Sequence, residues 1–220
     1  MRKILLFIVF ILLLGSCQKD NITVTLKTSG TLSVIVTDNN KNPLINQNVR
    51  LYTYYSSMSS NLLDNIKTNS NGEVNFGEVT EGTYTVVIDT PKVNGIKYLP
   101  IKTVQVLSGS GKTLTINVQE YSGTLNIKVV DNNNNALSGY NVILIASENF
   151  NSSDNINTKI NKAEFRSTTN TSGLAVFQIP SSRDFYFIAY DNSKTHISSY
   201  NYAYVEKDGT ISETAEIYIY

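Results

Sequence analysis

The side chains best suited to catalysis or metal binding are scarce in this sequence. It contains a single histidine, His196, and a single cysteine, Cys17, which cannot supply the ligands of a His/Cys zinc cluster. No Gly-x-Ser-x-Gly nucleophile motif occurs, and His196 follows a lysine and a threonine in a polar stretch, as expected of a surface residue. Composition alone leaves a Ser–His–Asp triad open. The simplest expectation is no catalytic site, no metal, no cofactor and no enzyme activity.

Two aspartates introduce asparagine-rich runs, at 38–42 and 131–135, whose oxygens are of the type that calcium prefers. A calcium loop of the EF-hand type also needs a glycine and a distal glutamate at fixed positions, and neither run supplies both. Asparagine and aspartate are common in tight turns because they tolerate a left-handed backbone. Both runs are therefore interpreted as solvated turns that begin at Asp38 and Asp131.

Tyrosine is the remaining residue type with recognition chemistry, and it is concentrated towards the C-terminus. Tyr200, Tyr202 and Tyr204 occupy alternate positions of one expected strand, and other strands carry further tyrosines, so some of the rings have to face solvent. Exposed tyrosines on a sheet face can stack on sugars or peptides. Cross-strand aromatic pairs are also ordinary stabilisers of sheets. These three tyrosines are the candidate ligand-binding residues, with sheet stabilisation as the simpler alternative.

The chain that carries these residues repeats itself. The stretch Gly30-Thr-Leu-Ser-Val-Ile-Val-Thr-Asp38 returns 93 residues later as Gly123-Thr-Leu-Asn-Ile-Lys-Val-Val-Asp131, and the register continues without a gap beyond it. A repeat of this length indicates a duplicated domain, because solenoid repeats are about 20–50 residues long. The sequence predicts one domain over 30–119 and a second over 123–220, joined by a very short linker.

Composition places both domains in the all-β class. Lys plus Arg equals Asp plus Glu, at 18 each, so the chain lacks the basic stripe that nucleic-acid binding requires. Tyrosine is plentiful, with 14 residues, as are threonine, valine and isoleucine, and tryptophan is absent. This composition favours strands over helices.

Alternating apolar residues separated by turn signals predict about seven short strands in the first domain, the pattern of a two-sheet sandwich. The strand at 84–88 has apolar residues on both faces and is expected to be central. The strand at 98–107 carries a proline near its start and is expected at an edge. Loops are expected at 56–61 and 89–95. The other expected strands are 31–37, 47–55, 62–68, 73–76 and 114–118.

The second domain repeats the opening of the first and then diverges. Its middle turn, at 169–173, lies about eight residues later than the corresponding turn of the first domain, so a polar insertion lies within 146–168. Loops on a rigid scaffold often bind ligands, but added loop length is also well tolerated. A binding loop and a neutral insertion both stay open. Strands are expected at 125–129, 141–145, 185–190, 200–205 and 216–220.

The first residues have the organisation of a secretory signal. Two basic residues precede an apolar run of about eleven residues, which is short of the roughly 20 that a transmembrane helix needs. The small residues directly before Cys17 resemble the lipobox of bacterial lipoproteins, in which signal peptidase II cuts before the cysteine. The resemblance implies a signal peptide at 1–16, acylation of Cys17 and a lipidated tether at 17–29. Cleavage elsewhere, leaving a free thiol, is the alternative.

The ordered motifs of the first domain resemble a known sandwich family. They are Gly-Thr-Leu-x-Val-x-Val-x-Asp, a polar turn with Pro-Leu, Asn-Val-x-Leu, Thr-Asn-x-x-Gly-x-Val-x-Phe at 68–76 and Gly-Thr-Tyr at 82–84. The series looks like the carboxypeptidase regulatory-like domain, also described as transthyretin-like or CnaB-like. The resemblance implies two tandem Ig-like β-sandwich domains. It implies no peptidase residues, because the accessory sandwich of that family lacks the zinc site.

These features predict a non-catalytic, lipid-anchored protein of the bacterial cell envelope that serves as a binding, spacer or assembly module. No acidic residue directly follows Cys17, which is compatible with passage to the outer membrane, and the run Gln18-Lys19-Asp20 resembles the surface-export signals of Bacteroidetes lipoproteins. Expected partners are the membrane, through the lipid, and a glycan, a peptide or another envelope protein. The alternatives are glycan or peptide recognition by the tyrosine-rich face and insertion of the second domain, and a structural stalk or adhesin subunit.

Overall fold

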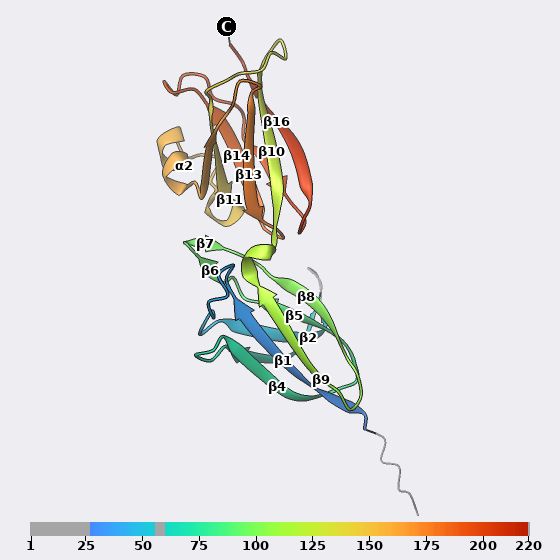
Figure 1. Cartoon of the computed structure of the whole chain (residues 1–220). Coiled ribbons are helices and arrows are strands. Elements are labelled where there is room, and N and C mark those ends of the chain that lie inside the picture. The colour runs from blue at the N-terminus through green and yellow to red at the C-terminus, as the bar shows by residue number, and fades with distance from the viewer. Residues whose placement is uncertain (1–26, 56–59, 220) are drawn as a thin grey trace, which may run out of the picture.

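Two β-sandwiches placed end to end make up the computed structural model, which describes residues 27–55 and 60–219 (Figure 1). The expected signal peptide, Cys17 and Tyr220 lie outside these described residues. Each sandwich consists of two facing sheets with its own apolar core, so the prediction of an all-β, Ig-like fold is confirmed. Within the described part of the chain, no helix is long and apolar enough to span a bilayer.

The N-terminal sandwich contains a three-stranded and a four-stranded sheet. The three-stranded sheet has the order β4-β1-β9, with β1 at Ser29–Thr37, β4 at Glu73–Thr80 and β9 at Gly111–Asn117. The four-stranded sheet has the order β3-β2-β5-β8, with β2 at Asn48–Tyr55, β3 at Ser60–Lys67, β5 at Gly82–Ile88 and β8 at Ile101–Val106. A small hairpin pairs β6 at Lys92–Val93 with β7 at Ile96–Lys97.

The C-terminal sandwich repeats this topology. Its first sheet has the order β13-β10-β16, with β10 at Ser122–Asp131, β13 at Leu174–Pro180 and β16 at Thr210–Ile217. Its second sheet has the order β12-β11-β14-β15, with β11 at Asn141–Ala146, β12 at Phe165–Thr168, β14 at Asp184–Tyr190 and β15 at Asn201–Tyr204. The helical segments are η1 at Val118–Glu120, η2 at Ser147–Asn149 and α2 at Ile156–Lys162.

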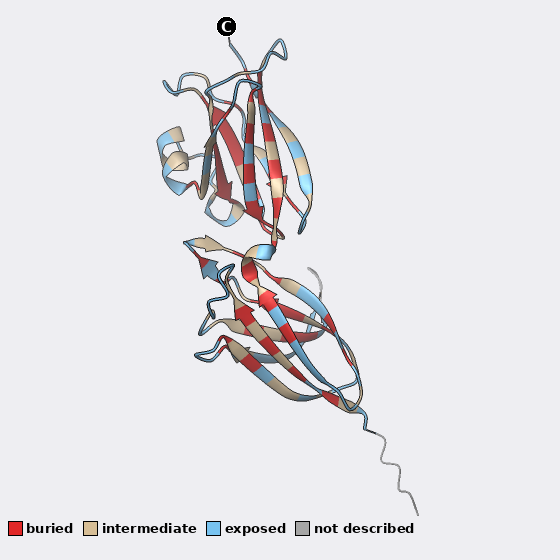
Figure 2. Ribbon diagram, in the orientation of Figure 1, coloured by how far each residue is buried: buried red, intermediate tan, exposed pale blue. Residues whose placement is uncertain are grey.

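The repeated opening strand forms the centre of the three-stranded sheet in each sandwich. In β1 and β10 every second residue is apolar and fully buried, which gives the alternating bands of Figure 2. Both strands pair antiparallel on one side and parallel with the last strand of their sandwich on the other. The large apolar residues at these alternating positions, all 0% exposed, are Leu32, Val34, Val36, Leu125, Ile127 and Val129.

The middle turn of each copy is held by the same set of contacts. Gly72 and Gly173 have positive φ values of 70° and 71°, and a Cβ on either would lie 2.6 or 2.7 Å from the carbonyl oxygen of Val36 or Val129. The same two carbonyl-bearing residues donate their N–H groups to the glycine carbonyls at 2.8 Å. Glycine is therefore required here both by backbone conformation and by the close approach of the first strand.

The expected strand positions within the four-stranded sheets are confirmed. Strand β5 lies between β2 and β8, as its apolar residues on both faces predicted, and β14 has the same central place between β11 and β15. Strand β8 lies at an edge. Of the expected loop at 56–61, residues 56–59 lie outside the described residues, and the remaining two belong to β3, whose first residue, Ser60, pairs with Tyr55. The expected loop at 89–95 contains β6, because Asn94 and Gly95 adopt positive φ and close a hairpin.

The last strand is the clearest error of the sequence-based assignment, which placed it at 216–220. The observed β16 spans Thr210–Ile217 and runs parallel to β10 from Thr124 to Asp131. Ala215 and Ile217 are its buried residues. Tyr218, in contrast, is 56% exposed, so it lies outside the core although it continues the run of apolar residues.

The insertion within 146–168 contains a helix, where the sequence analysis expected a loop. Helix α2 begins after Asn155, whose side chain accepts a hydrogen bond of 2.9 Å from the N–H of Thr158. Ile156 and Ile160 are spaced by four residues, so they lie on one side of the helix and pack onto the outer face of the second sheet. The insertion therefore creates a second, smaller core that contains Ile143, Ile145, Ala163, Ile188 and Tyr190.

Candidate functional site

The three candidate tyrosines lie on or beside β15, the edge strand of the second sheet. Ala203 and Val205 of this segment are buried, so the alternate residues point away from the main core. Tyr202 is 52% exposed and Tyr200 is 48% exposed, whereas Tyr204 is half-buried. We call Tyr186, Tyr200, Tyr202 and Tyr204, which lie outside the main core, the tyrosine face.

Tyr186 on β14 is the centre of an aromatic cluster. Its ring stacks on Phe150 with 4.3 Å between centroids and 24° between planes. Tyr200 and Tyr202 approach the same ring edge-on, at 5.9 and 6.1 Å. Tyr186 and Tyr202 are also a cross-strand pair, so these rings stabilise the sheet as well as covering it. Sequence reasoning did not single out Phe150, although it is the sole phenylalanine between 146 and 164.

The hydroxyl of Tyr202 is anchored by a carboxylate. It donates a hydrogen bond of 2.5 Å to Oδ1 of Asp184, the cross-strand partner of Tyr204. This hydrogen bond to a negatively charged group raises the pKa of Tyr202 to about 12, with burial as a smaller cause. The ring of Tyr202 is therefore held in one orientation while much of its surface remains open to solvent.

Two adjacent hollows meet at Tyr200, and we call them together the Tyr200 groove. One has a volume of about 230 Å³ and is lined by Ile156, Lys159, Ile197 and Ser199 among others. The other is shallower, with a volume of about 510 Å³, and is lined by Phe150, Ser152 and Tyr186 among others. The insertion supplies one wall of both hollows, so the groove exists only where the second copy departs from the first.

Lys159 of α2 brings a positive charge to this groove. Its Nζ atom lies 5.6 Å from the centroid of Phe150 and 6.0 Å from that of Tyr200. The ammonium also donates a hydrogen bond of 2.9 Å to the carbonyl oxygen of Ser152. One lysine thus joins the helix to the loop and to the tyrosine face.

Two residues of the tyrosine face, Tyr186 and Tyr202, replace threonines of the first copy. Leu51 pairs with Val86 in the N-terminal sandwich, and its counterpart Leu144 pairs with Phe187. By this register Tyr186 occupies the place of Thr85, and its partner Tyr202 occupies the place of Thr103. The same cross-strand position therefore carries two small polar side chains in one sandwich and two aromatic rings in the other.

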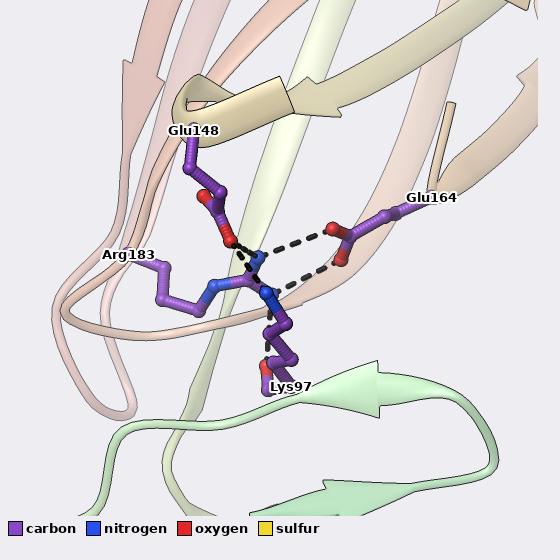
Figure 3. Close-up of polar contacts among 4 residues, drawn as sticks. All are labelled: Lys97, Glu148, Glu164 and Arg183. Carbon is purple, nitrogen blue, oxygen red and sulfur yellow. Dashed lines mark hydrogen bonds and ion pairs between the residues drawn. The ribbon is translucent and has the colours of Figure 1, made fainter. Parts of the chain in front are cut away.

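A second cluster joins the two sandwiches around Arg183 (Figure 3). Arg183 is 7% exposed and donates a hydrogen bond of 2.8 Å to the main-chain carbonyl of Lys97, which belongs to the N-terminal sandwich. It also bonds both carboxylate oxygens of Glu164, at 3.0 and 3.2 Å, and Glu148, at 2.9 Å. Nζ of Lys97 lies 3.3 Å from Oε1 of Glu148, which is the oxygen that Arg183 also bonds.

The charges of this cluster stabilise one another. Burial would lower the pKa of Arg183, but its hydrogen bonds and its attraction to Glu164 and Glu148 raise that pKa overall. Burial would raise the pKa of Glu148, yet a main-chain hydrogen bond and the charge of Arg183 hold it below its usual value. The sequence analysis did not find this cluster, because its residues are far apart in the chain and one partner is a main-chain carbonyl.

His196 is not arranged as the base of a catalytic triad. Its Nδ1 lies 3.1 Å from Oδ2 of Asp191, and Ser193 donates to that same oxygen at 2.6 Å. The serine hydroxyl therefore bonds the carboxylate, where a nucleophile would have to bond the histidine. The hydrogen bond from Ser193, followed by those from His196 and Thr195, lowers the pKa of Asp191.

The two asparagine-rich turns use their carboxylates internally. Asp38 accepts hydrogen bonds of 2.8 Å from the N–H groups of Asn40 and Asn42, and one of 2.9 Å from the amide side chain of Asn42. Asp131 makes the equivalent bonds, at the same distances, to the residues at 133 and 135. Across residues 27–55 and 60–219 there is no group of three or more His, Cys, Asp or Glu residues placed to hold a metal ion.

No known protein family and no curated protein matches this sequence. Among solved structures, the chain is similar to the Bacillus anthracis TIE protein, with 15% identity and a TM-score of 0.41 over 87% of this chain and 34% of the other. It is similar to a Streptococcal ancillary pilin, with 15% identity and a TM-score of 0.40 over 88% of this chain and 63% of the other.

A third similar structure is the minor pilin GBS52 of Streptococcus agalactiae, with 13% identity and a TM-score of 0.39 over 87% of this chain and 96% of the other. The chain thus spans about a third of the length of the first of these proteins and just under two thirds of the second. The function of this chain is therefore inferred from its own residues.

Proposed function

We propose that this protein is a non-catalytic spacer of the bacterial cell envelope, anchored in the outer membrane by lipid on Cys17. The observation that carries the spacer role is the Arg183 cluster, which ties the C-terminal sandwich to the N-terminal one. Strand β1 begins at the end of the N-terminal sandwich that is remote from the C-terminal sandwich (Figure 1). An anchor before β1 would therefore hold the tyrosine face well away from the membrane.

The joint between the sandwiches is supported by its short linker as well as by charge. Helix η1 leads almost directly from β9 into β10, and Asn117 caps it by accepting a hydrogen bond of 3.1 Å from Gln119. Tyr121 is 6% exposed, and its carbonyl accepts a hydrogen bond of 2.9 Å from the N–H of Ser181. A linker with these contacts has few other conformations available, which is the property that a stalk or adhesin subunit needs.

The spacer role is tested by the spread of distances between the two sandwiches. Spin labels are placed at exposed Lys112 and Thr214, each changed to cysteine in a Cys17→Ser background. Pulsed electron–electron double resonance should give one narrow distribution of distances between the two labels, and Arg183→Ala should broaden this distribution. Arg166→Ala is the matched control, because the described hydrogen bond of Arg166 stays within its own sandwich. A broad distribution in the unchanged chain would contradict a rigid spacer.

The lipid anchor is tested separately. Palmitate labelling of bacteria that express the full chain should mark the wild type and leave Cys17→Ala unlabelled. Fractionation should then place only the wild type with the outer membrane. Equal labelling of both proteins would refute the anchor and leave the spacer role standing, because the joint does not depend on the lipid.

We also propose that both sandwiches are carboxypeptidase regulatory-like domains with limits at 30–119 and 123–220. The shared turn around Gly72 and Gly173 supports a common origin, since the same close approach recurs in both copies. The polar run after Cys17 supports export to the cell surface of a Bacteroidetes-like envelope. A protease added to intact cells should cleave the protein if it faces outward and leave it intact if it is periplasmic.

A second candidate function is recognition of a glycan or peptide by the C-terminal sandwich. It is supported by the exposed rings of Tyr200 and Tyr202 and by the adjoining Tyr200 groove. Alanine replacement of Tyr200, Tyr202 and Tyr204 together should remove binding of the protein to a glycan and peptide panel. Unchanged binding by that triple variant would rule out recognition through this face.

A further inference from the structure

The Tyr200 groove has a fixed aromatic lining. The ring of Tyr186 is stacked on Phe150 and flanked by Tyr200 and Tyr202, so none of these rings has to be reoriented before a ligand binds. Tyr202 is further held by its hydrogen bond to Asp184. Binding to a preorganised surface loses less side-chain entropy than binding to a mobile one. Flat, half-exposed rings of this kind suit a ligand with flat apolar faces.

The groove also contains an unneutralised positive charge. An ammonium group has three N–H donors, and Lys159 uses one of them for the carbonyl of Ser152. Within the described residues, Lys159 forms no ion pair, whereas Lys162 of the same helix pairs with Asp154 at 2.7 Å. A ligand carboxylate beside Lys159 would therefore satisfy donors that the protein leaves open, next to rings that exclude water.

The position of the groove favours a saccharide over a peptide. It lies on the face of the second sheet, where the main-chain groups of β14 are already paired with β11 and β15. A peptide lying across the rings on this face could not pair with main-chain groups, because strand addition requires a free edge, which here is the outer edge of β15 beside the rings. A saccharide needs no main-chain partners. Its ring faces can stack on tyrosine, and its hydroxyl groups can bond polar side chains such as Ser152 and Ser199.

We propose that the Tyr200 groove binds a carboxylate-bearing saccharide, of the uronic-acid type, with a sugar face against Tyr200 and the carboxylate beside Lys159. This inference rests on the second proposed function, recognition by the tyrosine face, and names its ligand class. The insertion then has a definite role. It delivers Phe150 and Lys159 to a sheet whose counterpart in the first copy carries threonines.

The test is calorimetric titration of the mature chain carrying Cys17→Ser. The probes are short oligosaccharides of galacturonate, glucuronate and mannuronate, the methyl ester of each, and a glutamate-rich peptide of equal charge. We expect at least one acidic oligosaccharide to bind about tenfold more tightly than its ester, as expected when one partly shielded ion pair is lost. Lys159→Gln should remove this preference, and Lys159→Arg should restore most of it.

Matched controls separate the site from general surface effects. Lys128→Gln removes an exposed lysine on the other sheet of the same sandwich, and Tyr54→Ala removes a tyrosine that is 55% exposed on the N-terminal sandwich. Neither should change binding. Tyr200→Ala should weaken the acid and the ester alike, because it removes the stacking surface and leaves the charge. Thermal melts of all variants show whether they remain folded.

Each other outcome has a distinct meaning. If acid and ester bind equally and both are lost in Tyr200→Ala, recognition by the tyrosine face stands and the acidic class is wrong. If the glutamate-rich peptide binds more tightly than every saccharide, the ligand is a peptide and the inference is overturned. If none of the three uronates binds, the inference is likewise overturned, while the separate glycan and peptide panel decides whether any recognition remains.

Discussion

The guanidinium of Arg183 in the C-terminal sandwich donates a hydrogen bond of 2.8 Å to the main-chain carbonyl of Lys97 in the N-terminal sandwich. The side chain of Lys97 makes a second contact across the joint, to Glu148 at 3.3 Å. The first contact is buried and independent of the residue type at position 97. The second is on the surface and depends on it. The two residues on either side of one hydrogen bond are therefore expected to differ strongly in their importance.

Arg183→Ala should lower the free energy of unfolding by about 2–3 kcal/mol, because it leaves Glu164 partly buried without its charged partner. Lys97→Ala should cost less than about 1 kcal/mol, because it removes only an exposed ion pair and keeps the carbonyl that Arg183 binds. Urea denaturation of the full chain measures both values. Equal effects of the two substitutions would show that the joint depends on its surface charges.

Gly173→Ala should destabilise the C-terminal sandwich more than Gly139→Ala does. Both glycines have positive φ, at 71° and 77°, so each substitution carries a backbone penalty of about 1–2 kcal/mol. Only the Cβ at position 173 would meet Val129, at 2.7 Å from its carbonyl oxygen, whereas position 139 has open space. We expect a further 1–3 kcal/mol, roughly, for Gly173→Ala. Thermal melting compares the two, and equal losses would mean that the turn relaxes around the methyl group.

The features that could be predicted from sequence are those set by local patterns. Alternation in β1 and β10 identifies the buried residues, because a strand with one face in the core must be apolar at every second position. Apolar residues on both faces of β5 and β14 identify the central strands. The final strand was misplaced because Tyr218 and its neighbours continue the alternation past Ile217, where the core ends.

The candidate site was predicted only in part, because its other members come from distant segments. Tyr200 and Tyr202 could be found from their alternation, but their contact with Phe150 depends on how the insertion folds. Helix α2 left a weak signal, with Asn155 as a cap and two isoleucines four residues apart, within an otherwise polar stretch. The Arg183 cluster left none, because a main-chain acceptor has no signature in the sequence.

Ile188→Ala should show that the insertion builds a core of its own. Ile188 lies on the outer face of β14 and would be open to solvent without the insertion, yet it is 2% exposed. Removing its buried methyl and methylene groups should cost about 2–4 kcal/mol. Ile197 lines the Tyr200 groove and is 40% exposed, so Ile197→Ala should cost less than about 1 kcal/mol. Chemical denaturation measures both, and a small effect at Ile188 would indicate a loosely packed insertion.

The asparagine-rich turns should make both sandwiches sensitive to acid. Hydrogen bonds from the side chain and main chain of Asn42 and from the main chain of Asn40 hold the pKa of Asp38 below its ordinary value of 3.8. The equivalent residues lower the pKa of Asp131, led by the side chain of Asn135. A carboxylate with a lowered folded-state pKa stabilises the fold at pH values above 3.8, and this stabilisation is lost as the pH falls through the lowered value.

Asp131→Asn should therefore lower the melting temperature of the C-terminal sandwich at pH 6 and reduce its fall between about pH 4 and pH 2. The fall should not vanish, because Asp191 in the same sandwich also has a lowered pKa. Asp38→Asn should act in the same way on the N-terminal sandwich. Asp208→Asn is the control, since the described side-chain contact of Asp208 is with Lys207. A melting curve of Asp131→Asn parallel to that of the wild type across this range would show that the turn carboxylate contributes nothing to acid sensitivity.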